Sequence, residues 1–118
     1  MFKQRRLLLI DSSDSARTIL YQEILKQMPG LDIIACGTAR EARTAVQQFE
    51  FEIITTGITL PDMDGYSLID HIRKSPKNRD TAIFVISGDP ENRILGDDMD
   101  DSRAVTAYLT RPRGTSHW

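Results

Sequence analysis

This chain of 118 residues has a single cysteine, few aromatic residues and no long apolar run, and these shortages exclude several classes of protein. Cys36 has no second cysteine with which to form an internal disulfide. Because it lies in an apolar stretch, we expect a buried, inert thiol. The apolar run from Leu7 to Ile10 ends at Asp11, which makes it too short for a signal-peptide core or a membrane span. We therefore expect a cytoplasmic protein.

An excess of positive charge is also lacking. The chain has 15 Lys and Arg against 17 Asp and Glu, which gives a formal net charge of -2. No broad basic field is available to attract nucleic acid or an anionic membrane. A few basic residues near the two ends do not change this, so we expect neither partner. The length and the 40% of apolar residues predict one globular domain over residues 1–118.

What the chain does have is a regular alternation of strand and helix patterns. Short apolar runs predict strands, and apolar residues at helical spacing predict the helices between them. Alternation of this kind is typical of a parallel sheet with helices on both faces. The expected strands are 7–10, 33–36, 53–56, 82–86 and 105–109, and the expected helices are 16–28, 39–49, 66–74 and, on a weaker pattern, 90–98.

Polar residues mark several boundaries of these elements. Thr38 and Glu41 form the pattern of a capping box at the start of the second helix. Asp62 and Asp64 lie in the turn before the third helix, where we expect turn and N-cap residues. The segment 97–101 carries four carboxylates in five residues, which favours a mobile loop.

The third predicted strand leads into the most informative segment. It is followed by Gly57 and then by a Pro-Asp-Met-Asp-Gly turn over residues 61–65. In this arrangement the chain resembles the receiver domain of bacterial two-component response regulators. The resemblance implies a flavodoxin-like α/β fold with a doubly wound, five-stranded parallel sheet in the order 2-1-3-4-5. It also implies a fifth helix, which the residues after Arg111 cannot form; we expect the chain to be the N-terminal part of a longer signalling protein, or else to lack that helix.

The resemblance gives each strand end a family role. The first strand of the family ends in two acidic residues that bind Mg²⁺, and here these are Asp11 and Ser12. The third strand ends in the aspartate that accepts a phosphoryl group, and here that position is Gly57. The fourth ends in a hydroxyl residue that contacts the phosphate, here Ser87, and the fifth in Lys-Pro, here Arg111 and Pro112.

These departures predict a degenerate phosphorylation site. Glycine has no nucleophile, and Asp11 is one carboxylate where the family uses three, so we expect weak or absent Mg²⁺ binding, no cofactor and no enzymatic activity. We expect a pseudo-receiver that works through a protein partner or a homodimer, using the face of the fourth helix and fifth strand. Tyr108 matches the switch aromatic on that strand. Arg111 is hypothesised to lean toward Gly57 and pair with Asp11.

Two other functions remain open at this point. The first is an atypical phosphoacceptor receiver, or an active parent if Gly57 replaced an aspartate by engineering. The second is a flavodoxin-like domain that binds a small ligand. The acidic, glycine-free segment 11–14 after the first strand disfavours bound nucleotide or flavin phosphate. His71 is expected to be a surface residue.

Overall fold

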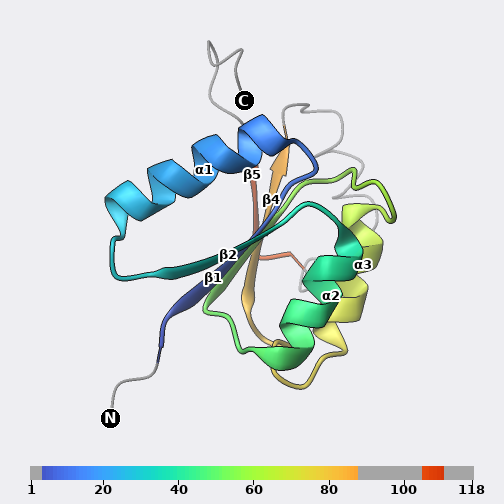
Figure 1. Cartoon of the computed structure of the whole chain (residues 1–118). Helices are drawn as coiled ribbons and strands as arrows, with labels where there is room; N and C mark the ends of the chain where they lie inside the picture. Colours follow the sequence, from blue (N-terminus) through green and yellow to red (C-terminus); the bar gives the residue numbers. More distant parts are fainter. Residues whose placement is uncertain (1–3, 88–104, 111–118) are drawn as a thin grey trace.

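The computed structural model of the chain describes residues 4–87 and 105–110. The fourth helix predicted over 90–98, the acidic segment 97–101 and the residues after 110 lie outside this part. The described elements alternate along the chain as expected (Figure 1). They are β1 (Arg6–Ile10), α1 (Asp14–Gln27), β2 (Asp32–Cys36), α2 (Ala39–Gln48), β3 (Ile53–Thr56), α3 (Gly65–Arg73), β4 (Ala82–Ser87) and β5 (Ala107–Thr110).

The five strands form one parallel sheet in the order β2-β1-β3-β4-β5, which confirms the predicted topology. At the carboxyl edge of the sheet, Ile10 of β1 pairs with Cys36 of β2 and with Thr56 of β3. Parallel strands therefore end side by side, and the residues that follow β1 and β3 are brought together. In open sheets of this kind this edge is where ligands bind.

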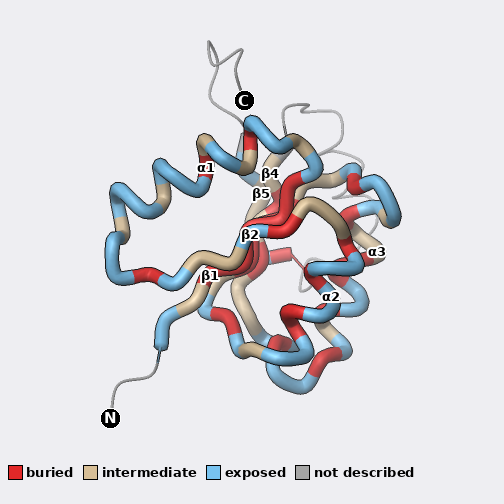
Figure 2. Tube along the Cα trace, in the orientation of Figure 1, coloured by how far each residue is buried: buried red, intermediate tan, exposed pale blue. Residues whose placement is uncertain are grey.

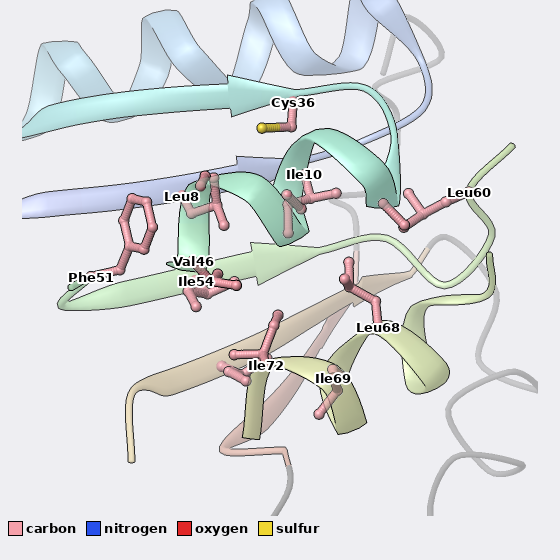
Figure 3. Packing of buried hydrophobic residues seen from close by; sticks show 14 of the residues in the cluster. Leu8, Ile10, Cys36, Val46, Phe51, Ile54, Leu60, Leu68, Ile69 and Ile72 are labelled. Carbon is pink, nitrogen blue, oxygen red and sulfur yellow. The ribbon is translucent and has the colours of Figure 1, made fainter. Parts of the chain in front are cut away.

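The main core lies between the sheet and the helices α2 and α3. The strands contribute Leu8 and Ile54, and α3 contributes Leu68 and Ile72, all with no exposed surface (Figure 3). Ile83 of β4 is buried in the same cluster. Burying one such side chain contributes about 1.5–3 kcal/mol. The apolar residues of α3 that recur at helical spacing thus face the core.

The opposite face of the sheet is covered by α1 (Figures 1 and 2). Leu20 of α1 packs with Leu7, Leu9 and Leu31 in a second cluster. Every second residue of β1 faces α1 and the others face α2, as the alternation of side chains along a strand requires. This explains why the four residues from Leu7 to Ile10 form an unbroken apolar run.

The fifth strand begins later than expected, at Ala107 rather than at residue 105. The Thr106 hydroxyl accepts a hydrogen bond from the Ile83 N–H at 2.9 Å, and Thr106 N–H donates to Ile83 O at 2.7 Å. The Thr106 side chain therefore provides the acceptor for Ile83 N–H that a backbone carbonyl would provide within the strand. Val105 is buried against the main core, so its apolar character serves packing ahead of the strand.

Each described helix has a polar cap at its start. Ser13 accepts a hydrogen bond from Ala16 N at 3.2 Å, and Thr38 accepts one from Glu41 N at 3.1 Å. The capping box predicted at the start of α2 forms, but its second hydrogen bond has a different donor. The Glu41 carboxylate reaches back to Gly37 N, one residue before the cap, at 3.2 Å.

Cys36 is buried at the carboxyl end of β2, as expected. Burial raises the pKa of its thiol to about 11, with a smaller contribution from the charge of Glu41. A thiol with so high a pKa holds almost no thiolate at neutral pH, and it is the thiolate that reacts.

None of the helices in residues 4–87 and 105–110 is long and apolar enough to cross a membrane.

Candidate functional site

The carboxyl edge of the sheet brings together three of the residues singled out from the sequence. Asp11 and Ser12 follow β1, and Gly57 follows β3. Gly57 N–H donates to Ile10 O at 3.0 Å, and Asp11 N–H donates to Cys36 O at 3.0 Å. These bonds extend the ladder by one residue, so Asp11 and Gly57 are held beside each other by the backbone.

Asp11 is buried, with 4% of its surface exposed. Its Oδ1 accepts a hydrogen bond from Ser13 N at 2.9 Å, which fixes the carboxylate at the start of α1. Arg17 of α1 donates from Nη1 to the Asp11 carbonyl at 2.7 Å and forms an ion pair with Asp14. Sequence reasoning missed Arg17. The spacing of Asp14 and Arg17, three residues apart in a helix, was the available signal.

Gly57 has open space around it among the described residues. A Cβ placed on it meets no atom of residues 4–87 and 105–110 within 4 Å outside its chain neighbours, and its φ is outside the left-handed region that favours glycine. Neither the backbone nor the packing of these residues therefore requires a glycine here.

The oxygen atoms around Gly57 already have partners. Gly57 O accepts a hydrogen bond from Thr56 Oγ1 at 2.9 Å, and Ser12 Oγ donates to Thr59 O at 3.3 Å. Within residues 4–87 and 105–110, no group of three or more His, Cys, Asp or Glu side chains could hold a metal ion. Of the three positions at the ends of β1 and β3, Asp11 offers a carboxylate, Ser12 a hydroxyl and Gly57 only a backbone carbonyl.

Ser87 and Tyr108 lie on the neighbouring strands. Ser87 is the last residue of β4 and pairs with Thr110 of β5, so its backbone reaches the same edge. Tyr108 pairs with Val85 and is partly buried against the main core. Arg111 lies outside the described residues, and its pairing with Asp11 stays a prediction.

Asp64 and Asp62 both cap helices, but not the same one. Asp64 is the N-cap of α3, as expected, and accepts from Ser67 N at 2.9 Å. Asp62 instead reaches across to α2, where its two carboxylate oxygens accept from Ala39 N at 2.8 Å and Arg40 N at 2.9 Å. The two carboxylates closest in sequence after Gly57 are thus engaged in positioning helices.

The Asp62 contact predicts a dependence of stability on pH. Its hydrogen bonds, chiefly that from Ala39 N, lower the pKa of Asp62. A group whose pKa is lowered by folding stabilises the fold above its unfolded pKa of about 3.9, and this stabilisation is lost as the pH falls through the folded pKa. We expect Asp62→Asn to lower the free energy of unfolding near neutral pH, and the difference from wild type to shrink in acid.

Urea unfolding of both proteins at about pH 7 and at about pH 3 measures that difference. Asp80→Asn, which changes an exposed carboxylate in the loop before β4, is the matched control and should follow wild type. A deficit of Asp62→Asn that is equally large at both pH values would contradict the capping role of the charge.

Gly65 is the glycine that packing does require. Its N–H donates to Ile58 O at 2.5 Å, and an added Cβ would overlap Gly57 O. We expect Gly65→Ala to lower the free energy of unfolding by about 2–3 kcal/mol, because backbone atoms must move to make room. Gly30→Ala is the control, since a Cβ there meets nothing within 4 Å. Chemical denaturation of the two variants in parallel tests this; equal stability of both would show that the loop after β3 shifts freely.

Comparison with known proteins agrees with this geometry. The family model of the response regulator receiver domain matches residues 7–111. The chain is 34% identical over 113 residues to a protein-glutamate methylesterase/protein-glutamine glutaminase 2 of Carboxydothermus hydrogenoformans, a match that covers 93% of this chain and 30% of that relative. It is 28% identical over 111 residues to the gliding motility regulatory protein of Myxococcus xanthus, covering 92% of this chain and 14% of that protein. The chain thus spans under a third of these relatives.

Solved structures share the fold. A sensor protein of Polaromonas sp. JS666 superposes with a TM-score of 0.79 at 27% identity, covering 93% of this chain and 86% of that one. The response regulator TrrA of Thermotoga maritima, solved in complex with Mg²⁺ and BeF, superposes with a TM-score of 0.78 at 20% identity, covering 96% and 91%.

Proposed function

The chain belongs to the response regulator receiver domain family, and we propose that it is a pseudo-receiver, a signalling module that is not phosphorylated at the usual site. The observation that supports this most directly is Gly57. It occupies the end of β3 where the family resemblance places the phosphoacceptor, and it has no side chain to accept a phosphoryl group. Since the described residues leave room for a side chain at this position, packing does not explain why a carboxylate is absent there.

The positions that the resemblance assigns to Mg²⁺ binding also have fewer carboxylates than the family uses. Mg²⁺ requires near-octahedral oxygen ligands and is normally anchored by carboxylates. Of the positions that the resemblance assigns to the metal, only Asp11 carries a carboxylate, and its Oδ1 already accepts from Ser13 N. The oxygens of Ser12 and Gly57 are neutral and have partners. This donor set does not fit Mg²⁺, so the proposed function involves no metal ion.

Receiver domains are regulatory modules that act on protein partners. For this chain we propose that signalling proceeds by contact alone, with the partner or a second copy setting the conformation that phosphorylation sets elsewhere. Tyr108 on β5, packed inward against the main core, is the residue proposed to report that conformation. The methylesterase relative is about three times as long as the segment that this chain matches, since the match covers 30% of it. A methylesterase activity would therefore require residues outside the matching segment.

The test is intact-mass spectrometry of the purified chain after incubation with acetyl phosphate and Mg²⁺, beside a receiver domain that is known to be modified. We expect the mass of this chain to stay unchanged while the control gains one phosphoryl group. A stable adduct of one phosphoryl group on this chain would overturn the proposal, and peptide mapping would then locate the acceptor.

A further inference from the structure

A groove lies between the carboxyl ends of α2 and α3, the two helices that run side by side over one face of the sheet (Figure 1). Its volume is about 420 Å³. Arg43 of α2 and His71 of α3 contribute to its walls, and Lys74 and Lys77 continue them after α3 ends. His71 is exposed, as the sequence predicted.

The charge of this groove is of one sign. Its lining includes Arg43, Lys74, Lys77 and His71, and none of the Asp or Glu residues that the structure describes lines it. The whole chain has a formal net charge of -2, so this gathering of positive charge differs from the average surface. A concave surface lined by one sign of charge concentrates ligands of the opposite sign.

Part of the groove lining is apolar, and its shape is held by hydrogen bonds. The apolar lining comes from Pro76, which is exposed, and from Val46, which belongs to the main core and is 2% exposed. The Val46 carbonyl accepts hydrogen bonds from Ser75 Oγ at 3.1 Å and from Asn78 Nδ2 at 2.8 Å. Lys77 Nζ donates to Gln48 O, the last residue of α2, at 3.1 Å. The loop after α3 is thus fastened to the end of α2, and the groove exists before any ligand binds.

The groove lies away from the carboxyl edge that holds Asp11 and Gly57. Helix α2 begins directly after β2 ends at that edge, and it runs back along the sheet until Gln48. The carboxyl ends of α2 and α3 therefore lie toward the amino edge of the strands. A partner in the groove leaves the degenerate site open.

We propose that this groove binds an acidic peptide segment of a partner protein, with one apolar side chain of the segment against Pro76 and its carboxylates facing the basic residues. Charge complementarity selects an acidic ligand, and the apolar lining at Pro76 favours an apolar anchor. The proposal does not depend on whether Gly57 abolishes phosphorylation. The other use of basic residues at helix ends is to offset the helix dipole, which would affect stability and bind nothing.

Fluorescence anisotropy distinguishes the two uses. The probe is a fluorescein-labelled peptide with a central leucine flanked by two glutamates on each side, and a second peptide carries alanine in place of the leucine. The test variant is Arg43→Gln with Lys74→Gln. The control is Lys26→Gln with Arg79→Gln, which removes two positive charges from exposed positions outside the groove.

We expect the leucine peptide to bind wild type with a dissociation constant on the order of 10–100 μM, weakened about fivefold to tenfold in the groove variant and less than twofold in the control. Binding should weaken with added salt, and the alanine peptide should bind less tightly than the leucine peptide. Equal weakening in both double variants would overturn the proposal in favour of a general charge effect. No binding to wild type, with loss of stability in the groove variant alone, would assign the basic residues to the helix ends.

A second copy of this chain is the competing occupant, because residues 97–101 have the sequence Asp-Asp-Met-Asp-Asp. Sedimentation equilibrium of wild type and of the groove variant decides this point. A concentration-dependent dimer that the groove variant abolishes would replace the partner protein by a second copy. A monomer in both cases, together with peptide binding, supports the proposal as stated.

Discussion

Replacing Ser12 and Gly57 together by aspartate is expected to make the chain accept a phosphoryl group from acetyl phosphate when Mg²⁺ is present. The substitution at Gly57 supplies a carboxylate whose oxygen can attack phosphorus while acetate leaves. The substitution at Ser12 gives a second carboxylate next to Asp11. Three carboxylates at one edge anchor Mg²⁺, which neutralises the charge of the phosphoryl group during transfer.

The fold is expected to tolerate both changes. A Cβ at Gly57 meets no atom within 4 Å and the φ there suits any residue, while Ser12 is exposed. Ser12→Asp gives up one hydrogen bond of 3.3 Å to Thr59 O. Clustering three carboxylates without metal costs some stability, because like charges at short range repel. Added Mg²⁺ should therefore raise the melting temperature of the double variant and leave that of wild type unchanged.

Intact mass and thermal unfolding, each with and without Mg²⁺, give the readouts. We expect no adduct on wild type or on Ser12→Asp, which lacks the acceptor. The double variant should gain one phosphoryl group, and Gly57→Asp alone should gain less because its metal set is incomplete. The pair Ser12→Asp with Gly57→Asn is the matched control, since an amide of the same shape provides no nucleophilic oxygen. If the double variant binds Mg²⁺ but stays unmodified, the loss of reactivity extends beyond these two positions.

The fold could be predicted from this sequence because its signals are local. The unbroken apolar run at Leu7 and the helical spacing around Leu68 each specify an element and its buried side within a few residues. Topology then follows from the rules for parallel strands, and the resemblance assigned the order. For the same reason Asp11 and Gly57 could be assigned to the ends of neighbouring strands from the sequence.

What could not be predicted depends on contacts between residues distant in sequence. Asp62 caps α2, whose start at Ala39 is 23 residues earlier, although its own turn opens α3. Sequence patterns identify a capping residue and the helix that follows it in the chain. They do not show that the fold brings the start of another helix close enough to be capped by the same residue. The open space at Gly57 is likewise a property of the packed structure. The sequence alone does not distinguish a glycine that packing or backbone conformation requires from one that could be replaced by another residue.

Asn78 is the strongest case of such a contact, and we expect Asn78→Ala to lower the free energy of unfolding by about 3–5 kcal/mol. Asn78 is fully buried. Its Oδ1 accepts from Phe51 N at 2.8 Å, and its Nδ2 donates to the carbonyls of Val46 and Phe49, both at 2.8 Å. In Asn78→Ala the Val46 carbonyl keeps its hydrogen bond from Ser75 Oγ, whereas Phe51 N and the Phe49 carbonyl lose the side-chain partner that Asn78 provides. Each buried group left without a hydrogen bond costs about 1–3 kcal/mol.

Ser75→Ala provides a graded control for this effect. Ser75 Oγ donates a hydrogen bond to Val46 O, and in Ser75→Ala that carbonyl keeps its hydrogen bond from Asn78. Its removal is expected to cost about 1 kcal/mol. Urea unfolding of the two variants beside wild type measures both losses through the shift of the midpoint at constant slope.

The same asparagine couples stability to the basic groove. Asn78 fastens the loop that carries Pro76 and Lys77 to the end of α2, so its loss frees one wall of the groove as well as exposing backbone groups. Under conditions where Asn78→Ala is still folded, we expect it to bind the acidic peptide more weakly although no basic residue has changed. A variant that is destabilised as predicted yet binds with the affinity of wild type would show that the groove is shaped by the helices alone. If Asn78→Ala were no less stable than Ser75→Ala, water would have taken over the buried hydrogen bonds, and the end of α2 would be more accessible than its burial indicates.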